Sequence, residues 1–114
     1  MGRSLRAGER VSAPGKASSI ADSLQAPMPG MVPFGVIKPL LSDGFTVGDK
    51  EISHAISLAF RLLKLVVEPG GAASLAAAVE MATQTSDSAI GIVLSGGNAD
   101  PETIMQCCAA VPVP

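Results

Sequence analysis

Hydrophobic periodicity is clearest between residues 49 and 63. Apolar side chains recur there at intervals of three and four, the spacing of one helix face, at Ile52, Ala55, Ile56, Ala59 and Leu63. The opposite face carries Lys50, His54 and Arg61. The pattern predicts an amphipathic helix over 49–63, and it predicts that His54, the only histidine, faces solvent.

Two further apolar segments follow in the chain. Alanine and glycine dominate residues 70–82, which predicts a second helix that can approach its neighbours closely. Residues 89–94 form an unbroken apolar run, which favours a strand buried on both faces. A shorter strand is predicted at 45–47, after a helical turn over 36–41.

Polar and turn-forming residues mark the boundaries of these elements. The loop at 95–98 reads Ser-Gly-Gly-Asn, and the Asp100-Pro101 pair is typical of a helix start, which predicts a third helix over 100–110. Residues 11–33 contain four prolines and predict a long irregular segment. Irregular segments of that length usually build a site or pack against another part of the molecule.

The alternation of strands and helices predicts the α/β class. Two short strands, at 45–47 and 89–94, cannot bury three helices. We therefore expect a partial mixed or parallel sheet with covering helices, in a single incomplete domain that spans residues 1–114.

Composition narrows the possible functions. The chain has 114 residues, 47% hydrophobic and 16% charged, which excludes a disordered chain and predicts one core. A net charge of −2 without Trp or Tyr argues against nucleic-acid binding. No apolar run approaches the roughly 20 residues of a membrane span. We expect a soluble cytoplasmic chain that binds neither nucleic acid nor membrane.

Other chemical motifs are weak. Cys107 and Cys108 are adjacent, which suits neither a metal site nor a loop-closing disulfide, so we expect free thiols. Gly15-Lys16 is similar to the end of a phosphate-binding loop, but Ala17 stands where that motif requires Ser or Thr.

Two candidate ligand-binding features remain. Ser95 and Gly96 follow the predicted buried strand, and ligands of open α/β sheets bind beyond the carboxyl ends of strands. Glu68 lies beside the predicted start of the helix over 70–82. Each feature also has a purely structural interpretation, as ordinary turn chemistry or as a carboxylate at a helix start.

Four segments together resemble the carboxyl-terminal part of a threonine or serine dehydratase. They are Ser19-Ile20-Ala21-Asp22, Phe45-Thr46-Val47 with Asp49 and Glu51-Ile52, Lys64-Leu65-Val66-Val67-Glu68-Pro69, and Val93-Leu94-Ser95-Gly96-Gly97-Asn98. That family belongs to the fold type II pyridoxal-phosphate enzymes, with serine racemase and, more distantly, the tryptophan synthase beta chain. The resemblance covers roughly residues 3–100 and implies the carboxyl-terminal portion of the large domain.

The resemblance implies a function and cofactor contacts. The reaction would be β-elimination from serine or threonine, which yields a 2-oxo acid and ammonia. Ser95 would hydrogen-bond the pyridine nitrogen of pyridoxal 5'-phosphate, Gly96 would let the backbone approach, and Glu68 would lie near the ring. Ser23 follows the Ile-Ala-Asp turn at a position where the family usually has glycine, beside the cofactor.

Two family motifs have no counterpart in this chain, which has no Ser-x-Lys and no run of four glycines. The acidic metal site of some members also lies upstream of the matched segment, so we assign neither catalytic nor metal-binding residues. We expect a truncated fragment that is inactive alone and does not retain the cofactor. The alternatives are a non-catalytic interaction module, which pairs with a full-length homologue or a separate amino-terminal half, and an unrelated small α/β domain. A homo-oligomer is also possible.

Overall fold

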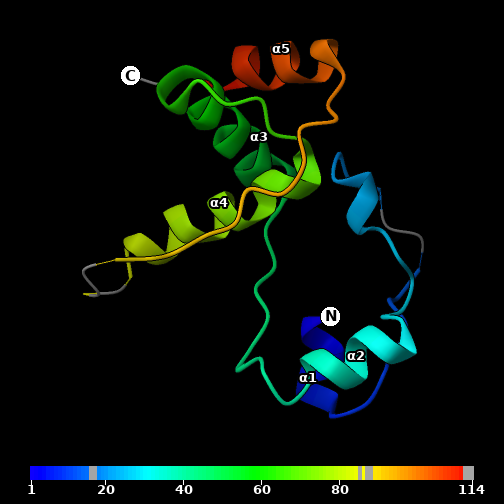
Figure 1. The fold of residues 1–114 in the computed structure, drawn as a ribbon. Coiled ribbons are helices and arrows are strands. Elements are labelled where there is room, and N and C mark those ends of the chain that lie inside the picture. Colours follow the sequence, from blue (N-terminus) through cyan, green and yellow to red (C-terminus); the bar gives the residue numbers. More distant parts are fainter. Residues whose placement is uncertain (16–17, 85, 87–88, 112–114) are drawn as a thin grey trace. The chain divides into compact units, whose positions relative to one another are not determined.

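The structure is a computed structural model that describes residues 1–15, 18–84, 86 and 89–111 (Figure 1). Lys16 and Ala17, which entered the comparison with the phosphate-binding loop, lie outside the described residues. The chain divides into two compact units, one of residues 1–18 and 23–46 and the other of residues 19–22 and 47–114. Compact units need not fold independently, so the single domain over 1–114 stays a prediction.

The first unit contains three short helices. They are α1 (Gly2–Ala7), the 3-10 helix η1 (Asp22–Leu24), whose first residue belongs to the second unit, and α2 (Met31–Ile37). The α1 helix has no counterpart among the sequence predictions, because six residues are too few to show a helical period. Within the predicted irregular segment 11–33 the chain folds back on itself, since the Ala13 amide donates to the Pro27 carbonyl at 2.7 Å.

Close backbone packing and polar contacts hold the first unit together. A Cβ at Gly44 would lie 2.7 Å from the Cα of Gly2, so both positions favour glycine. Arg6 forms an exposed ion pair with Asp43 at 3.1 Å. The pKa of the Asp43 carboxyl is lowered, mainly because the Gly44 amide donates to it and also because Arg6 lies beside it.

Helix α3 (Asp49–Leu58) organises the second unit. It contacts both α4 (Pro69–Ala82) and α5 (Pro101–Ala110) (Figure 1). Four residues of the predicted apolar face are buried, Ile52, Ala55, Ile56 and Ala59. They pack with Ala72 and Ala76 of α4 and with Ile104 and Cys107 of α5.

The helix predicted over 49–63 changes geometry at its end. Residues Ala59–Leu63 form the π-helix η2, and Lys64 ends it in the left-handed region at φ 60°. A π turn is wider than an α turn and rotates the residues that follow it. Leu63, predicted on the buried face, is therefore 53% exposed.

The other two helices lie where the sequence predicts them. The α4 helix begins at Pro69, directly after Glu68, and buries Pro69, Gly71, Ala72 and Ala76. The α5 helix begins at Pro101, and the Asp100 carboxylate accepts a hydrogen bond from the Thr103 amide at 3.3 Å.

Neither predicted strand is present among the described residues, none of which is assigned to a strand. Residues 89–94 are extended but pair with no neighbouring strand, and Val93 is 76% exposed instead of buried. A strand requires a partner backbone, and apolar sequence alone does not provide one. Residues 45–47 are also irregular. The sheet of the predicted α/β fold is thus not formed in the part of the chain that the structure describes.

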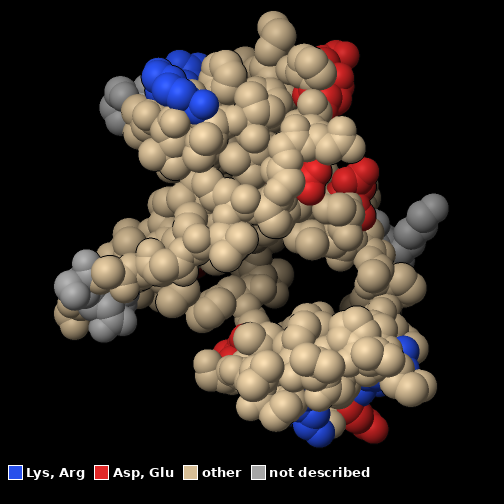
Figure 2. All heavy atoms as spheres, viewed as in Figure 1, with Lys and Arg blue, Asp and Glu red and all other residues tan. Residues whose placement is uncertain are grey.

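The surface and the remaining motifs fit these elements. In the described residues no helix is both long enough and apolar enough to span a membrane. Acidic and basic atoms are scattered over the face seen in Figure 2, most of which is uncharged. Cys107 is buried and Cys108 is half-buried, and both are free thiols.

Candidate functional site

Glu68 and the loop at 95–98 lie against each other in the second unit. The Glu68 amide donates to the Gly96 carbonyl at 3.2 Å. A Cβ added at Gly96 would collide with the Glu68 carboxylate, and one added at Gly97 would lie 2.9 Å from the Val66 carbonyl oxygen. Gly96 also has φ 77°, a conformation that glycine adopts without strain. Two motifs distant in sequence therefore meet through a close backbone approach.

The local sequence explains how Glu68 reaches this position. The chain leaves η2 at Lys64 and runs extended to Glu68, which precedes the first residue of α4. Pro69 occupies the first helical position, where its lack of an amide hydrogen costs nothing. The Glu68 carbonyl accepts the Ala72 amide at 2.9 Å. The carboxylate is thus placed at a helix amino terminus, which favours negative charge.

Helix α4 makes two further contacts with the loop segment. A Cβ at Gly71 would overlap the carbonyl oxygen of Ser95. The Ser74 hydroxyl donates to the Val93 carbonyl at 2.7 Å. Sequence analysis did not assign either residue to the site. The available signal was the series of small residues in the first turns of α4, which was interpreted only as allowing close packing.

Three of the four predicted cofactor-binding residues come together here. Ser95 and Gly96 are exposed and Glu68 is half-buried, so the loop is accessible from solvent. The fourth, Ser23, is exposed in η1 and belongs to the first unit. Its participation in the site stays a prediction.

The Ser-Ile-Ala-Asp turn that precedes Ser23 is fixed to the start of α3. The Ser19 hydroxyl donates to the Asp49 carboxylate at 2.5 Å, and the Ile20 amide donates to the same carboxylate at 3.3 Å. Ala21 is buried in the core of the second unit. Two of the four segments that carry the family resemblance therefore contact each other directly.

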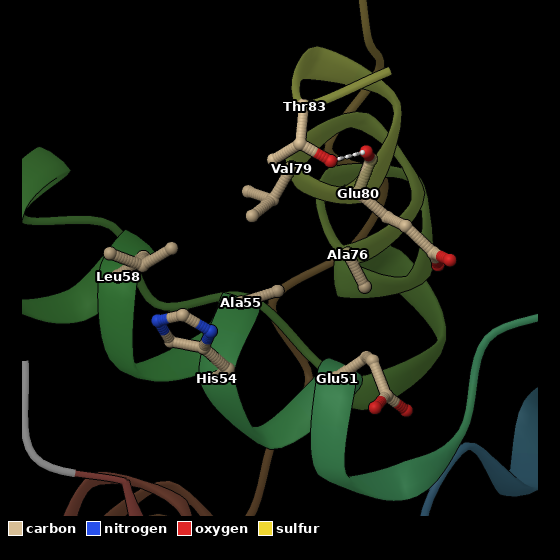
Figure 3. A pocket seen from close by; sticks show the side chains of 8 residues that line it. All are labelled: Glu51, His54, Ala55, Leu58, Ala76, Val79, Glu80 and Thr83. Carbon is tan, nitrogen blue, oxygen red and sulfur yellow. Dashed lines mark hydrogen bonds between the residues drawn. The ribbon is translucent and has the colours of Figure 1, made fainter.

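Two hollows in the described part of the second unit lie elsewhere. One of about 310 Å³ opens between α3 and α4 (Figure 3) and is lined by Glu51, His54, Ala55, Leu58, Ala76, Val79, Glu80 and Thr83. His54, predicted to face solvent, is half-buried there with its ring beside Leu58 (Figure 3). A second hollow of about 270 Å³ lies beside Cys107. None of the four candidate residues lines either hollow.

The polar groups that the loop at 95–98 offers are neutral. Among the described residues no three His, Cys, Asp or Glu side chains gather in a way that could hold a metal. The loop instead offers a neutral hydroxyl at Ser95 and glycine backbone at Gly96 and Gly97. A flat ring can approach such a surface closely and accept or donate single hydrogen bonds.

Comparisons of the sequence and of the structure with known proteins point to the same family. The profile of the pyridoxal-phosphate dependent enzymes matches residues 1–96, which include Glu68, Ser95 and Gly96. A serine racemase from Dictyostelium discoideum is 35% identical over 107 residues, which are 91% of this chain and 33% of that protein.

Solved structures of similar enzymes share the fold. A threonine deaminase from T.th. superposes with a TM-score of 0.80 at 31% identity, over 87% of this chain and 33% of that one. Maize serine racemase gives a TM-score of 0.78 at 36% identity, over 96% of this chain and 35% of that one. This chain thus spans about a third of the length of these proteins. It belongs to the pyridoxal-phosphate dependent enzyme family, as its motifs predict.

Proposed function

We propose that residues 1–114 form one wall of a pyridoxal-phosphate site that eliminates water from a hydroxy amino acid such as serine or threonine. The observation that carries this proposal is the hydrogen bond from the Glu68 amide to the Gly96 carbonyl, which joins the two motifs expected beside the cofactor. The names of the similar proteins, a threonine deaminase and serine racemases, support an amino-acid substrate.

The residues present fit one edge of the cofactor. Ser95 would donate a hydrogen bond to the pyridine nitrogen, and its neutral hydroxyl would not keep that nitrogen protonated. Gly96 would allow the ring to approach the backbone, because it carries no side chain and its φ of 77° favours glycine. When bound, the cofactor would supply the electron sink that lets the α-proton and the β-hydroxyl of the substrate leave.

The same chain does not supply every group that the reaction requires. Its lysines are Lys16, Lys38, Lys50 and Lys64, none of which follows a serine by two positions. The run of four glycines that would hold the cofactor phosphate is also missing from the sequence. We therefore propose that the 114-residue polypeptide alone is inactive, and that its sheet forms only beside strands from another segment.

A chimera provides a direct test of this proposal. Residues 1–114 replace the matching third of maize serine racemase, and the chimera is given pyridoxal phosphate with L-serine or L-threonine. We expect cofactor absorbance on the protein and release of a 2-oxo acid. The isolated 114-residue chain should release none above background. Chiral analysis of the remaining serine measures racemisation in the same samples.

Two substitutions at Ser95 in the chimera test the role of its hydroxyl. Ser95→Ala should weaken cofactor binding and lower turnover by about tenfold or more, because the ring nitrogen loses its partner. Ser95→Thr keeps the hydroxyl and should retain most of both. Equal cofactor binding and turnover in Ser95→Ala would refute the assigned role of Ser95. Substantial turnover by the isolated chain would refute its proposed dependence on another segment.

A second candidate function is a non-catalytic interaction module. The observation that favours it is the exposure of large apolar side chains next to the candidate site, at Leu62, Leu63, Leu65, Val66 and Val93. Contiguous exposed apolar surface of a few hundred Å² usually marks a partner site. The partner would be a full-length homologue or an amino-terminal half that supplies the missing strands.

Light scattering during size-exclusion chromatography tests this second candidate. We expect a mixture of the chain with the amino-terminal two thirds of maize serine racemase to elute as one heterodimer. A chain that elutes only as a monomer in that mixture contradicts the interaction module. That result would not bear on the proposed cofactor site, which the chimera tests with the two segments covalently joined.

A further inference from the structure

Glu68 and the first two turns of α4 fix the segment that carries Ser95 at three points. The Ser74 hydroxyl donates to the Val93 carbonyl at 2.7 Å. The Glu68 amide donates to the Gly96 carbonyl at 3.2 Å. Between them the Ser95 carbonyl lies so close to Gly71 that a Cβ at Gly71 would overlap it. Ser95 therefore has a fixed backbone on both sides while its side chain stays exposed.

The contacts of Ser74 distinguish this arrangement from ordinary helix chemistry. A serine inside a helix commonly donates to a carbonyl of the preceding turn. Ser74 does approach the Gly71 carbonyl, at 3.4 Å, but its shorter bond, at 2.7 Å, goes to Val93 on the other segment. The hydroxyl thus joins two segments of the chain, and an alanine at position 74 would remove the link without changing helix propensity unfavourably.

Gly71 contributes by its lack of a side chain, which leaves room for the Ser95 carbonyl. It is buried in the first turn of α4. Nothing in its helical conformation requires glycine, because its φ is not positive. The nearby Ser95 carbonyl accounts for glycine at position 71, because the Cβ of an alanine there would displace the backbone of the candidate site.

We infer that Gly71 and Ser74 are positioning residues, which set the place from which the Ser95 hydroxyl meets a planar ring nitrogen. This inference rests on the proposed function for its ligand, and on the contacts of α4 for its geometry. Their contacts are with the loop backbone, at the Ser95 and Val93 carbonyls. Both act by holding the backbone that presents Ser95.

Hydrogen exchange of backbone amides in the 114-residue chain tests whether Gly71 and Ser74 hold the loop, and it requires no cofactor. The Glu68 amide reports on the loop because it donates to Gly96. We expect its exchange to accelerate about tenfold in Gly71→Ala and about fivefold in Ser74→Ala. Ser74→Thr should keep the rate of the parent chain. Gly91→Ala is the matched glycine control, because nothing lies within 4 Å of a Cβ added there. The Ile52 amide of α3 monitors folding in every variant.

Cofactor binding to the chimera tests the second half of the inference. In Gly71→Ala and Ser74→Ala we expect weaker binding of pyridoxal phosphate by about fivefold, with the absorbance maximum displaced in the same direction as in Ser95→Ala. Ser74→Thr should restore both. A packing role alone would not reproduce the spectral change of Ser95→Ala.

The outcomes separate cleanly. Unchanged exchange of the Glu68 amide in both variants overturns the inference. Faster exchange with unchanged affinity and spectrum overturns the positioning of Ser95, although the loop contact is then correct. A parent chimera that binds no pyridoxal phosphate overturns the proposed function and with it the role toward a ring. The exchange rates still decide whether Gly71 and Ser74 hold the loop.

Discussion

Helix α3 has an apolar face and the segment 89–94 is apolar throughout, yet the structure holds them in different ways. The α3 helix buries Ile52, Ala55 and Ile56 almost completely between α4 and α5. Val93, in the other segment, is 76% exposed. The segment 89–97 is attached to Glu68 and α4 through backbone carbonyls, which accept from Ser74 and from the Glu68 amide.

The difference shows what apolar sequence does and does not determine. A helix satisfies its own backbone, so an apolar stripe needs only another surface to be buried. An extended segment must find hydrogen-bond partners on a different part of the chain. Stability should therefore depend on side chains in α3, and in 89–97 on backbone contacts together with Leu94, which packs against the core. The following predictions test that contrast in the free energy of unfolding, from the largest effect to the smallest.

The largest loss is expected from Ile56→Ala. Ile56 is 1% exposed at the centre of the core, so its removal leaves a cavity. We expect a loss of about 2–4 kcal/mol in the free energy of unfolding, measured by urea titration followed by circular dichroism. Ile56→Val, which removes a single methylene, should cost about 1 kcal/mol. If Ile56→Ala lost less than about 1 kcal/mol, the claim that side-chain packing holds α3 would be contradicted.

The next effect is expected from Gly96→Ala, in the other region. Alanine would have to adopt φ 77° and displace the Glu68 carboxylate. We expect a loss of about 1–2 kcal/mol in the same titration. Gly91→Ala is the control, because its added Cβ meets nothing within 4 Å. Equal losses in the two variants would show that the fixed backbone of the loop contributes nothing specific.

A smaller effect is expected where the loop segment passes into α5. The Asp100 carboxylate accepts the Thr103 amide, which satisfies one donor at the helix start. Asp100→Ala should cost about 1 kcal/mol, whereas Asp100→Asn, which can cap equally well, should cost much less. Thermal unfolding by calorimetry measures both. An Asp100→Asn loss equal to that of Asp100→Ala would indicate that charge, and not the cap, matters here.

The smallest effect is expected from Val93→Ala. Its side chain is largely exposed, and its contact with α4 uses the carbonyl oxygen, which alanine keeps. We expect a change within about 0.5 kcal/mol in the urea titration. In the chimera the same variant should cost more if neighbouring strands cover this segment. Identical losses in both settings would contradict the proposed sheet partner.

The sequence predicts the helices of this protein better than its extended segments. The period of Ile52, Ala55, Ile56 and Ala59 depends only on local geometry, and so does the Asp100-Pro101 start of α5. The exposure of residues 89–94 depends on which segments lie beside them, and no local pattern encodes that. The π turn at Ala59–Leu63 leaves no composition signal, so the outward position of Leu63 could not be foreseen.

The candidate site shows the same division. The resemblance located Glu68, Ser95 and Gly96, because their motifs are short and contiguous. Gly71 and Ser74 belong to a run of small residues that reads as ordinary helix packing. Their contacts with Ser95 and Val93 become visible only when the two segments are placed side by side.

The π turn of η2 also has a consequence for comparing related sequences. A π turn accommodates one residue more than an α turn, at the end of a helix whose buried face is already complete. A homologue that lacks one residue between Ala59 and Leu63 could close the turn as α-helix and leave all later contacts in register. Alignments should therefore tolerate a single-residue gap in that stretch. They should tolerate none between Val66 and Ser74, where Val66, Glu68, Gly71 and Ser74 lie against the loop segment.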